Sequence, residues 1–148
     1  EWVGAQGKKV HGFIVKPNNF DASKKYPLLV LIHGGPQGAW SDNWGYRWNP
    51  QIFANAGYVV FTPNPRGSTG YGQQFVNEVS GDWGGRAYVD IMNGVAEVIR
   101  SNTFIDPARV GKAQVAAPSR AGKSAASRLS GMGNRVAEVV PWAATPLN

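Results

Sequence analysis

The sequence contains no cysteine among its 148 residues and only two histidines, His11 and His33. The absence of cysteine excludes a disulfide framework, a thiolate metal site and a cysteine nucleophile. Two histidines far apart in the sequence, without a paired-histidine motif, give no basis for predicting a zinc site. We therefore expect neither a metal ion nor another cofactor.

Long apolar runs are also missing from the sequence. No stretch approaches the roughly 18 apolar residues that a membrane helix needs. Residues 1–10, EWVGAQGKKV, lack the charged, apolar and small-residue zones of a signal peptide. These absences predict a soluble protein with no membrane partner and slightly favour the cytoplasm, but they leave the localisation undetermined.

Acidic residues are scarce toward the carboxyl end of the chain. Residues 1–111 hold 10 Lys and Arg against 8 Asp and Glu, whereas residues 112–148 hold 5 against 1. The basic residues of the second part lie among Ala, Ser and Gly, a pattern that favours a solvated helix face over an anion-binding surface. The six tryptophans do not interleave with these charges, so we expect no nucleic-acid partner.

Apolar strands alternate with helices along the chain. Continuous β-favouring runs predict strands covered on both faces at 28–32 and 58–62. Apolar residues at helical spacing predict a helix over 87–101. Further strands are expected at 10–16, 109–117 and 137–144, and further helices at 48–55 and 119–130. This order predicts an α/β fold, a mostly parallel sheet with helices on both faces.

Catalytic groups in such a sheet gather where strands end at their carboxyl side. Three loops qualify, HGGPQGAW, NPRGSTGYGQQF and APSRAGK. The third has two interpretations. It is a relaxed P-loop if Ala117, Gly122, Lys123 and Ser124 cradle a phosphate. It is a nucleophile elbow if the chain bends sharply around Ser119.

The pairing of HGGP with RGSTGYG at this separation, followed by DIMNGVAEVIRSNTFIDPARVG, resembles the catalytic domain of the prolyl oligopeptidase family. These are serine peptidases of the α/β-hydrolase fold, and they include dipeptidyl and acylaminoacyl peptidases. The resemblance covers about residues 7–111. It implies that residues 1–148 form a single partial α/β-hydrolase-like domain, truncated before the last strands, in which residues 112–148 are a divergent elbow and tail.

The resemblance implies a serine nucleophile and an oxyanion hole. Counting back from the segment NRV places Ser119 in the position of the nucleophile. The backbone N–H groups of Gly35 and Arg120 would then bind the oxyanion. Ala117 and Ala121 stand where the GxSxG turn of the family has glycines, and alanine is disfavoured there if the backbone needs a positive φ.

No histidine follows Ser119 in this sequence, and nothing after it resembles the later Asp and His of the family. Loss of one triad member typically costs several orders of magnitude in rate. Lys123 could act as the base only if burial kept it neutral. The sequence leaves open a serine peptidase or esterase, a noncatalytic hydrolase-fold fragment or interaction module, and a P-loop nucleotide binder.

The remaining residues of the loops have structural or substrate roles in this interpretation. The resemblance implies that His33 shapes its loop rather than acting as the base, and we expect Arg66 to anchor its loop by ion pairing while Tyr71 packs. Trp40 and Trp44 are predicted to line an apolar pocket for a peptide or small ester substrate. A sheet that ends early has a free edge, which predicts a homodimer.

Overall fold

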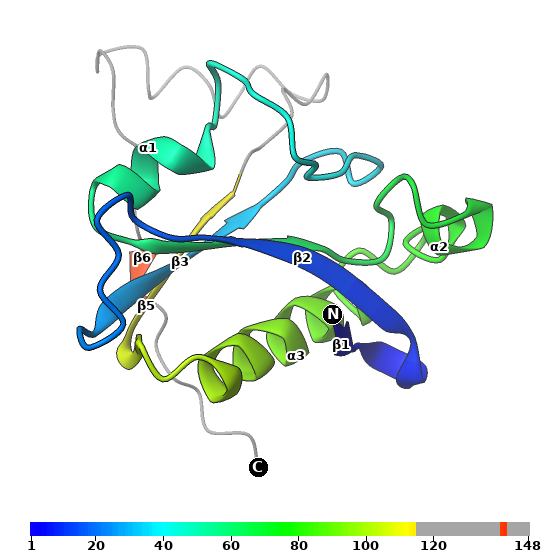
Figure 1. Ribbon diagram of the computed structural model, residues 1–148. Coiled ribbons are helices and arrows are strands. Elements are labelled where there is room, and N and C mark those ends of the chain that lie inside the picture. The colour runs from blue at the N-terminus through cyan, green and yellow to red at the C-terminus, as the bar shows by residue number, and fades with distance from the viewer. Residues whose placement is uncertain (115–139, 142–148) are drawn as a thin grey trace.

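One twisted sheet forms the centre of the molecule, and helices cover both of its faces (Figure 1). The computed structural model describes residues 1–114, 140 and 141. The strand order is β1-β2-β4-β3-β5-β6. The strands are β1 Trp2–Val3, β2 Lys9–Val15, β3 Tyr26–Ile32, β4 Val59–Asn64, β5 Ile105–Gln114 and β6 Val140–Pro141. The helices are α1 Pro50–Asn55, α2 Gln73–Asn77 and α3 Arg86–Ser101, with a short 3-10 turn, η1, at Ala5–Gly7.

The sheet is mixed in its described part. β3 pairs in parallel with β4 on one side and with β5 on the other, which confirms a parallel centre. β2 runs antiparallel to both β1 and β4, and β6 runs antiparallel to β5. A strand toward the edge can leave one face partly solvated when it is antiparallel. The neighbouring residues Phe13 and Ile14 of β2 point to opposite faces and are 42% and 37% exposed, so both faces of β2 are partly solvated at this point.

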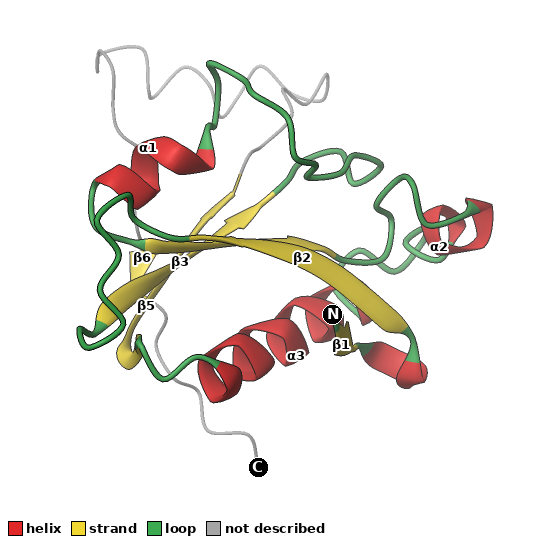
Figure 2. Cartoon of the chain, viewed as in Figure 1, coloured by secondary structure: helices red, strands yellow, loops and turns green. Residues whose placement is uncertain are grey.

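The central strand β3 is buried on both faces because α1 and α3 lie on opposite sides of the sheet (Figure 2). Leu28 and Val30 belong to the apolar cluster on the α3 side. Leu29 and Leu31 belong to the cluster on the α1 side. Each fully buried aliphatic side chain stabilises the fold by about 1.5–3 kcal/mol. The predicted coverage of both faces of the sheet is confirmed.

None of the helices in the described residues is long and apolar enough to cross a bilayer.

Helix α1 begins two residues later than the sequence pattern predicts. Trp48 has a φ of 56°, a left-handed conformation that cannot continue a right-handed helix. Asn49 caps the helix instead, because its Oδ1 accepts a hydrogen bond of 2.9 Å from Gln51 N. Pro50 then occupies the first turn, where its missing N–H is not needed. The predicted start at residue 48 is therefore wrong.

Strand β5 begins before its predicted start at residue 109. Tyr26 pairs with Ile105 and Leu28 pairs with Val110, so the register shifts between these pairs. Asp106 and Pro107, residue types that are common in turns, lie inside this irregularity. The short elements β1 and α2 were not predicted because they are too short to show a period, and the helix expected at 119–130 lies outside the described residues.

The cap of α1 gives a first testable prediction. Asn49→Ala should lower the free energy of unfolding by about 1 kcal/mol, because the N–H of Gln51 loses its partner. Asn49→Asp should have little effect, since aspartate is an equally good cap. Urea denaturation of both variants measures the difference. Equal losses in the two variants would show that packing, rather than the cap, accounts for the effect of Asn49.

Candidate active site

The loop after β3 presents an exposed backbone at Gly35. This residue has a φ of +137°, and a Cβ built on it would lie 2.7 Å from Gln37 N. A side chain at position 35 would therefore clash with the next turn of the loop. Among the described residues, no hydrogen-bond partner is found for Gly35 N–H. The N–H is thus available to a ligand, as an oxyanion donor must be.

His33 lies beneath this loop and is held at both ring nitrogens. Its Nδ1 lies 3.0 Å from the carbonyl oxygen of Gly34, and its Nε2 lies 2.8 Å from Ser68 Oγ. Burial lowers the pKa of His33 below its ordinary value, and the hydrogen bond to Gly34 opposes that shift only in part. The ring is therefore neutral at pH 7. These contacts agree with a loop-shaping role.

The loop after β4 is joined to the loop after β3 by several hydrogen bonds. Thr69 N donates to Gly38 O over 2.9 Å. The side chain of Asn64, which is fully buried, accepts from Trp40 N and donates to Trp40 O. Asn64 also donates to the hydroxyl of Tyr71. The two loops therefore form one connected edge of the sheet.

The parallel register places the end of β5 beside the loop of Gly35. Ile32, the last residue of β3, pairs with Gln114, the last residue of β5. The sequence that carries the predicted nucleophile Ser119 and the predicted donor Arg120 begins directly after Gln114. Ser119 and Arg120 themselves lie outside the described residues.

The two predicted substrate-contacting tryptophans differ in their surroundings. Trp40 is partly buried against the apolar cluster on the α1 side, and its indole N–H donates to Leu31 O over 2.9 Å. Trp44 is 71% exposed, and its ring stands edge-on to that of Tyr46. The structure thus gives Trp40 a structural contact and leaves the ring of Trp44 accessible.

Arg66 anchors the loop after β4 through a buried charge cluster. Its Nε lies 3.3 Å from Glu78 Oε2 and 3.5 Å from Asp90 Oδ2, although it makes a hydrogen bond to no described residue. Its backbone N donates to Asp90 Oδ2, and its other guanidinium nitrogens donate to Gln6 Oε1 and Ala5 O. The predicted anchoring role is confirmed, since the side chain is completely buried.

The second histidine is engaged elsewhere. The ring of His11 stacks on Tyr71 with centroids 5.2 Å apart, and its Nδ1 lies 3.4 Å from Glu1 Oε1. Tyr71 also packs against Phe75, as its predicted packing role requires. No group of three or more His, Asp or Glu among residues 1–114 could hold a metal ion.

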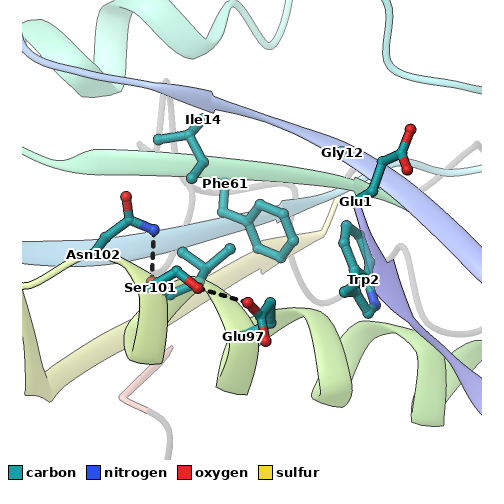
Figure 3. A pocket seen from close by; sticks show the side chains of 9 residues that line it. Glu1, Trp2, Gly12, Ile14, Phe61, Glu97, Ser101 and Asn102 are labelled. Carbon is teal, nitrogen blue, oxygen red and sulfur yellow. Dashed lines mark hydrogen bonds between the residues drawn. The ribbon is translucent and has the colours of Figure 1, made fainter.

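A small pocket with a volume of about 150 Å³ lies on the α3 side of the sheet (Figure 3). Trp2, Ile14 and Phe61 form its apolar wall, and Glu1 and Glu97 are its acidic residues. Both carboxylates are already paired, Glu1 with Lys9 and Glu97 with Arg100. The pocket contains none of the residues of the Gly35 and Arg66 loops. It is therefore separate from the candidate site.

Asn64 and Ser68 were not singled out from the sequence, although both connect the loops. Both are 0% exposed. Asn64 ends a fully buried strand, and a polar side chain in that position must find hydrogen-bond partners. That position was the signal that could have identified Asn64. Ser68 gave no comparable signal, because serine is common in turns.

Comparison with known proteins identifies relatives of one kind. A family model described as the prolyl oligopeptidase family matches residues 44–113. Dipeptidyl-peptidase 5 of Schizosaccharomyces pombe is 54% identical over 103 residues, which are 70% of this chain and 15% of that protein. Dipeptidyl-peptidase 5 of Arthroderma otae is 52% identical over 101 residues, covering 68% of this chain and 14% of that protein. The chain therefore spans a small part of the length of these relatives.

Solved structures share the fold. The Pyrococcus horikoshii acylaminoacyl peptidase superposes with a TM-score of 0.69 at 31% identity, over 77% of this chain and 18% of that one. A Mycobacterium tuberculosis puromycin-hydrolysing peptidase gives a TM-score of 0.67 at 26% identity, over 76% of this chain and 18% of that one. The mixed sheet with helices on both faces is thus an α/β-hydrolase fold, as predicted.

Proposed function

Because the chain belongs to the prolyl oligopeptidase family, we propose that it carries the nucleophile and the oxyanion donors of a serine hydrolase acting on peptides. Ser119 Oγ loses its proton to a base and bonds to the acyl carbon of the substrate. The bond to the leaving amine breaks, and the amine takes up the proton. Water then releases the acyl group from Ser119. A small ester would react in the same way and release an alcohol.

The observation that carries the proposal is the pairing of Ile32 with Gln114. It brings the end of β5 to the loop whose Gly35 N–H is exposed and unpartnered among the described residues. Ser119 follows Gln114 by only five residues in the sequence. A nucleophile and an oxyanion donor must both lie about 3 Å from the reacting carbonyl group, so this proximity is required.

The base in this proposal is neither histidine of the sequence. His33 is bonded at both ring nitrogens, and His11 is stacked on Tyr71 and paired with Glu1. These contacts engage both rings with partners other than a nucleophile. The group that accepts the proton of Ser119 is therefore neither His11 nor His33.

Labelling with a fluorophosphonate probe tests the proposal, because the probe reacts only with an activated hydroxyl group. We expect one covalent adduct, mapped by mass spectrometry to Ser119. Absence of labelling together with tight ATP–Mg²⁺ binding would support the P-loop interpretation of residues 117–124 instead. A result with neither labelling nor ATP–Mg²⁺ binding would support a noncatalytic role, which the alanines at 117 and 121 favour.

Two substrate types distinguish the activities named for the relatives. A dipeptide p-nitroanilide with a free amino group reports removal of a dipeptide. An N-acetylated amino acid p-nitroanilide reports removal of an acylated residue. We infer that the dipeptide substrate is preferred, since the relatives above 50% identity are named dipeptidyl-peptidase 5.

The predicted homodimer through a free sheet edge stays a prediction.

Trp44 is our candidate for contact with the substrate, because its ring is exposed in the loop that carries Gly35. Trp44→Ala should raise KM about 3- to 30-fold and leave kcat nearly unchanged, as loss of uniform binding does. Trp83, which is 70% exposed in the loop after α2, provides the control variant Trp83→Ala. A fall in kcat without a change in KM would contradict a binding role for Trp44. Trp40 stays a predicted substrate contact.

A further inference from the structure

The peptide unit between Gly34 and Gly35 links His33 to the oxyanion donor. The only cis peptide among the described residues is the next one, Gly35–Pro36, so the Gly34–Gly35 unit is trans. In a planar trans peptide the C=O and the N–H point in opposite directions. Because Gly34 O lies 3.0 Å from His33 Nδ1, the N–H of Gly35 points away from the histidine ring. The orientation of one group therefore determines that of the other.

The position of the proton on His33 follows from the acceptors around the ring. A neutral imidazole has one N–H donor and one acceptor nitrogen. Gly34 O can only accept, so Nδ1 must carry the proton if that hydrogen bond is to form. Nε2 is then an acceptor, and the hydroxyl group of Ser68 is the donor within reach, at 2.8 Å.

The hydroxyl group of Ser68 has two acceptors within reach but only one proton. When it donates to Pro65 O, 2.6 Å away, Nε2–H of His33 must donate to Ser68 Oγ, and Nδ1 faces Gly34 O without a proton. When it donates to His33, Nδ1–H donates to Gly34 O and Pro65 O keeps its bond of 3.0 Å from Ser68 N, so we expect this second arrangement. The side chain is 0% exposed, so water does not compete for it. The loop also closes tightly over the ring, since a Cβ on Gly38 would lie 2.9 Å from Gly34 O.

We propose that Ser68 is a positioning residue of the oxyanion-binding loop. Its hydroxyl group donates to His33 Nε2, keeps the proton of the neutral ring on Nδ1, and so holds Gly34 C=O toward the ring and Gly35 N–H toward the substrate. The catalytic consequence rests on the proposed function. The arrangement of protons does not, and it can be tested by itself.

Nitrogen NMR of the full chain tests the arrangement without any activity. We expect the ring nitrogens of His33 to show the proton on Nδ1 in the unmodified protein. Ser68→Ala should move the ring toward a mixture of tautomers and shift the amide signal of Gly35. Ser80→Ala, at an exposed position after α2, should shift neither signal. A ring protonated on Nε2, or an unchanged Gly35 signal in Ser68→Ala, would overturn the proposal.

The labelling rate of the fluorophosphonate probe tests the catalytic consequence. Removing one oxyanion donor typically costs 10²–10³-fold, so a misdirected donor should cost less. We expect the maximal labelling rate to fall about 10-fold in Ser68→Ala and about 100-fold in His33→Leu, with the probe's half-saturating concentration unchanged. His33→Asn should stay within a few fold, because the asparagine amide replaces Nδ1–H.

The variants separate the possible failures. If the unmodified chain is not labelled at all, the proposed function fails while the NMR result still decides the role of Ser68. If His33→Asn loses as much rate as His33→Leu, or Ser68→Ala reacts at the full rate, the proposed positioning role is wrong. Thermal unfolding of each variant identifies a loss of fold, and Ser68→Ala keeps the Thr69–Gly38 hydrogen bond that joins the two loops.

Discussion

Ser119→Ala is expected to abolish labelling by the fluorophosphonate probe and to lower kcat about 10⁴- to 10⁶-fold. The reason is chemical, since the hydroxyl oxygen of this residue forms the covalent bond to the acyl group in the proposed reaction. Losses of this size follow removal of the nucleophile in serine peptidases, and the oxyanion donors and substrate binding account for the rate that remains. Hydrolysis of a dipeptide p-nitroanilide, followed over several orders of magnitude, measures the effect.

Serines close to position 119 provide matched controls. Ser124→Ala and Ser127→Ala each remove a serine hydroxyl group that lies within ten residues of Ser119 in the sequence. Neither should alter labelling by more than a few fold. If Ser119→Ala is labelled as fast as the unmodified protein, the nucleophile is another residue and the assignment by alignment with the family is wrong. Labelling that moves to Ser124 would contradict the assignment in the same way.

Asp90→Ala is expected to have the largest effect on stability, a fall of about 3–5 kcal/mol in the free energy of unfolding. Asp90 is 0% exposed, and its carboxylate accepts hydrogen bonds from Ala5 N and Arg66 N. It also lies 3.5 Å from the buried guanidinium of Arg66. Removing it leaves the buried N–H of Arg66 and the partly buried N–H of Ala5 without this partner, and it leaves Glu78 as the remaining counter-charge of Arg66. Urea denaturation followed by circular dichroism measures the loss.

A surface ion pair serves as the control for Asp90. Asp106 pairs with Arg109 over 2.7 Å near the surface, so Asp106→Ala should leave the denaturation midpoint nearly unchanged. Asp90→Asn keeps an acceptor oxygen for Ala5 N but removes the charge, so its loss should be intermediate and measurable even if the alanine variant does not fold. If Asp90→Ala and Asp106→Ala are equally stable, the buried cluster does not hold the loop of Arg66.

The Asp90 cluster also connects stability to the candidate site. Arg66 lies near the start of the loop that carries Ser68 and Thr69, which contact the loop of Gly35. Movement of Arg66 would therefore displace the partner of His33. Asp90→Asn should consequently lower the labelling rate as well as the stability, whereas Ser68→Ala should affect mainly the rate.

Much of the fold was predictable from local sequence patterns. The apolar run Leu28–Leu31 predicts a strand buried on both faces, and the helical spacing of apolar residues over 87–101 predicts a helix with one buried face. The structure confirms both elements. The loops at the carboxyl ends of the strands followed from the same order of elements, whereas Gly35 was singled out by the resemblance of HGGP to the family motif. The start of α1 was not predictable in this way. The residue types from position 48 onward suit a helix, but Trp48 has a left-handed backbone and Asn49 is the N-cap, so the helix begins only at Pro50.

The sequence by itself determined the longer strands and helices, the loops at the carboxyl ends of the strands, and the resemblance of its motifs to one family. Only the tertiary structure decided that β2 runs antiparallel, that Ser68 lies against His33 across 35 residues of sequence, and that Arg66 is shared between Glu78 and Asp90. The physical reason is the distance along the sequence over which each kind of interaction acts. Periodicity and turn preferences act over a few neighbouring residues, whereas hydrogen bonds between loops depend on how distant strands are paired.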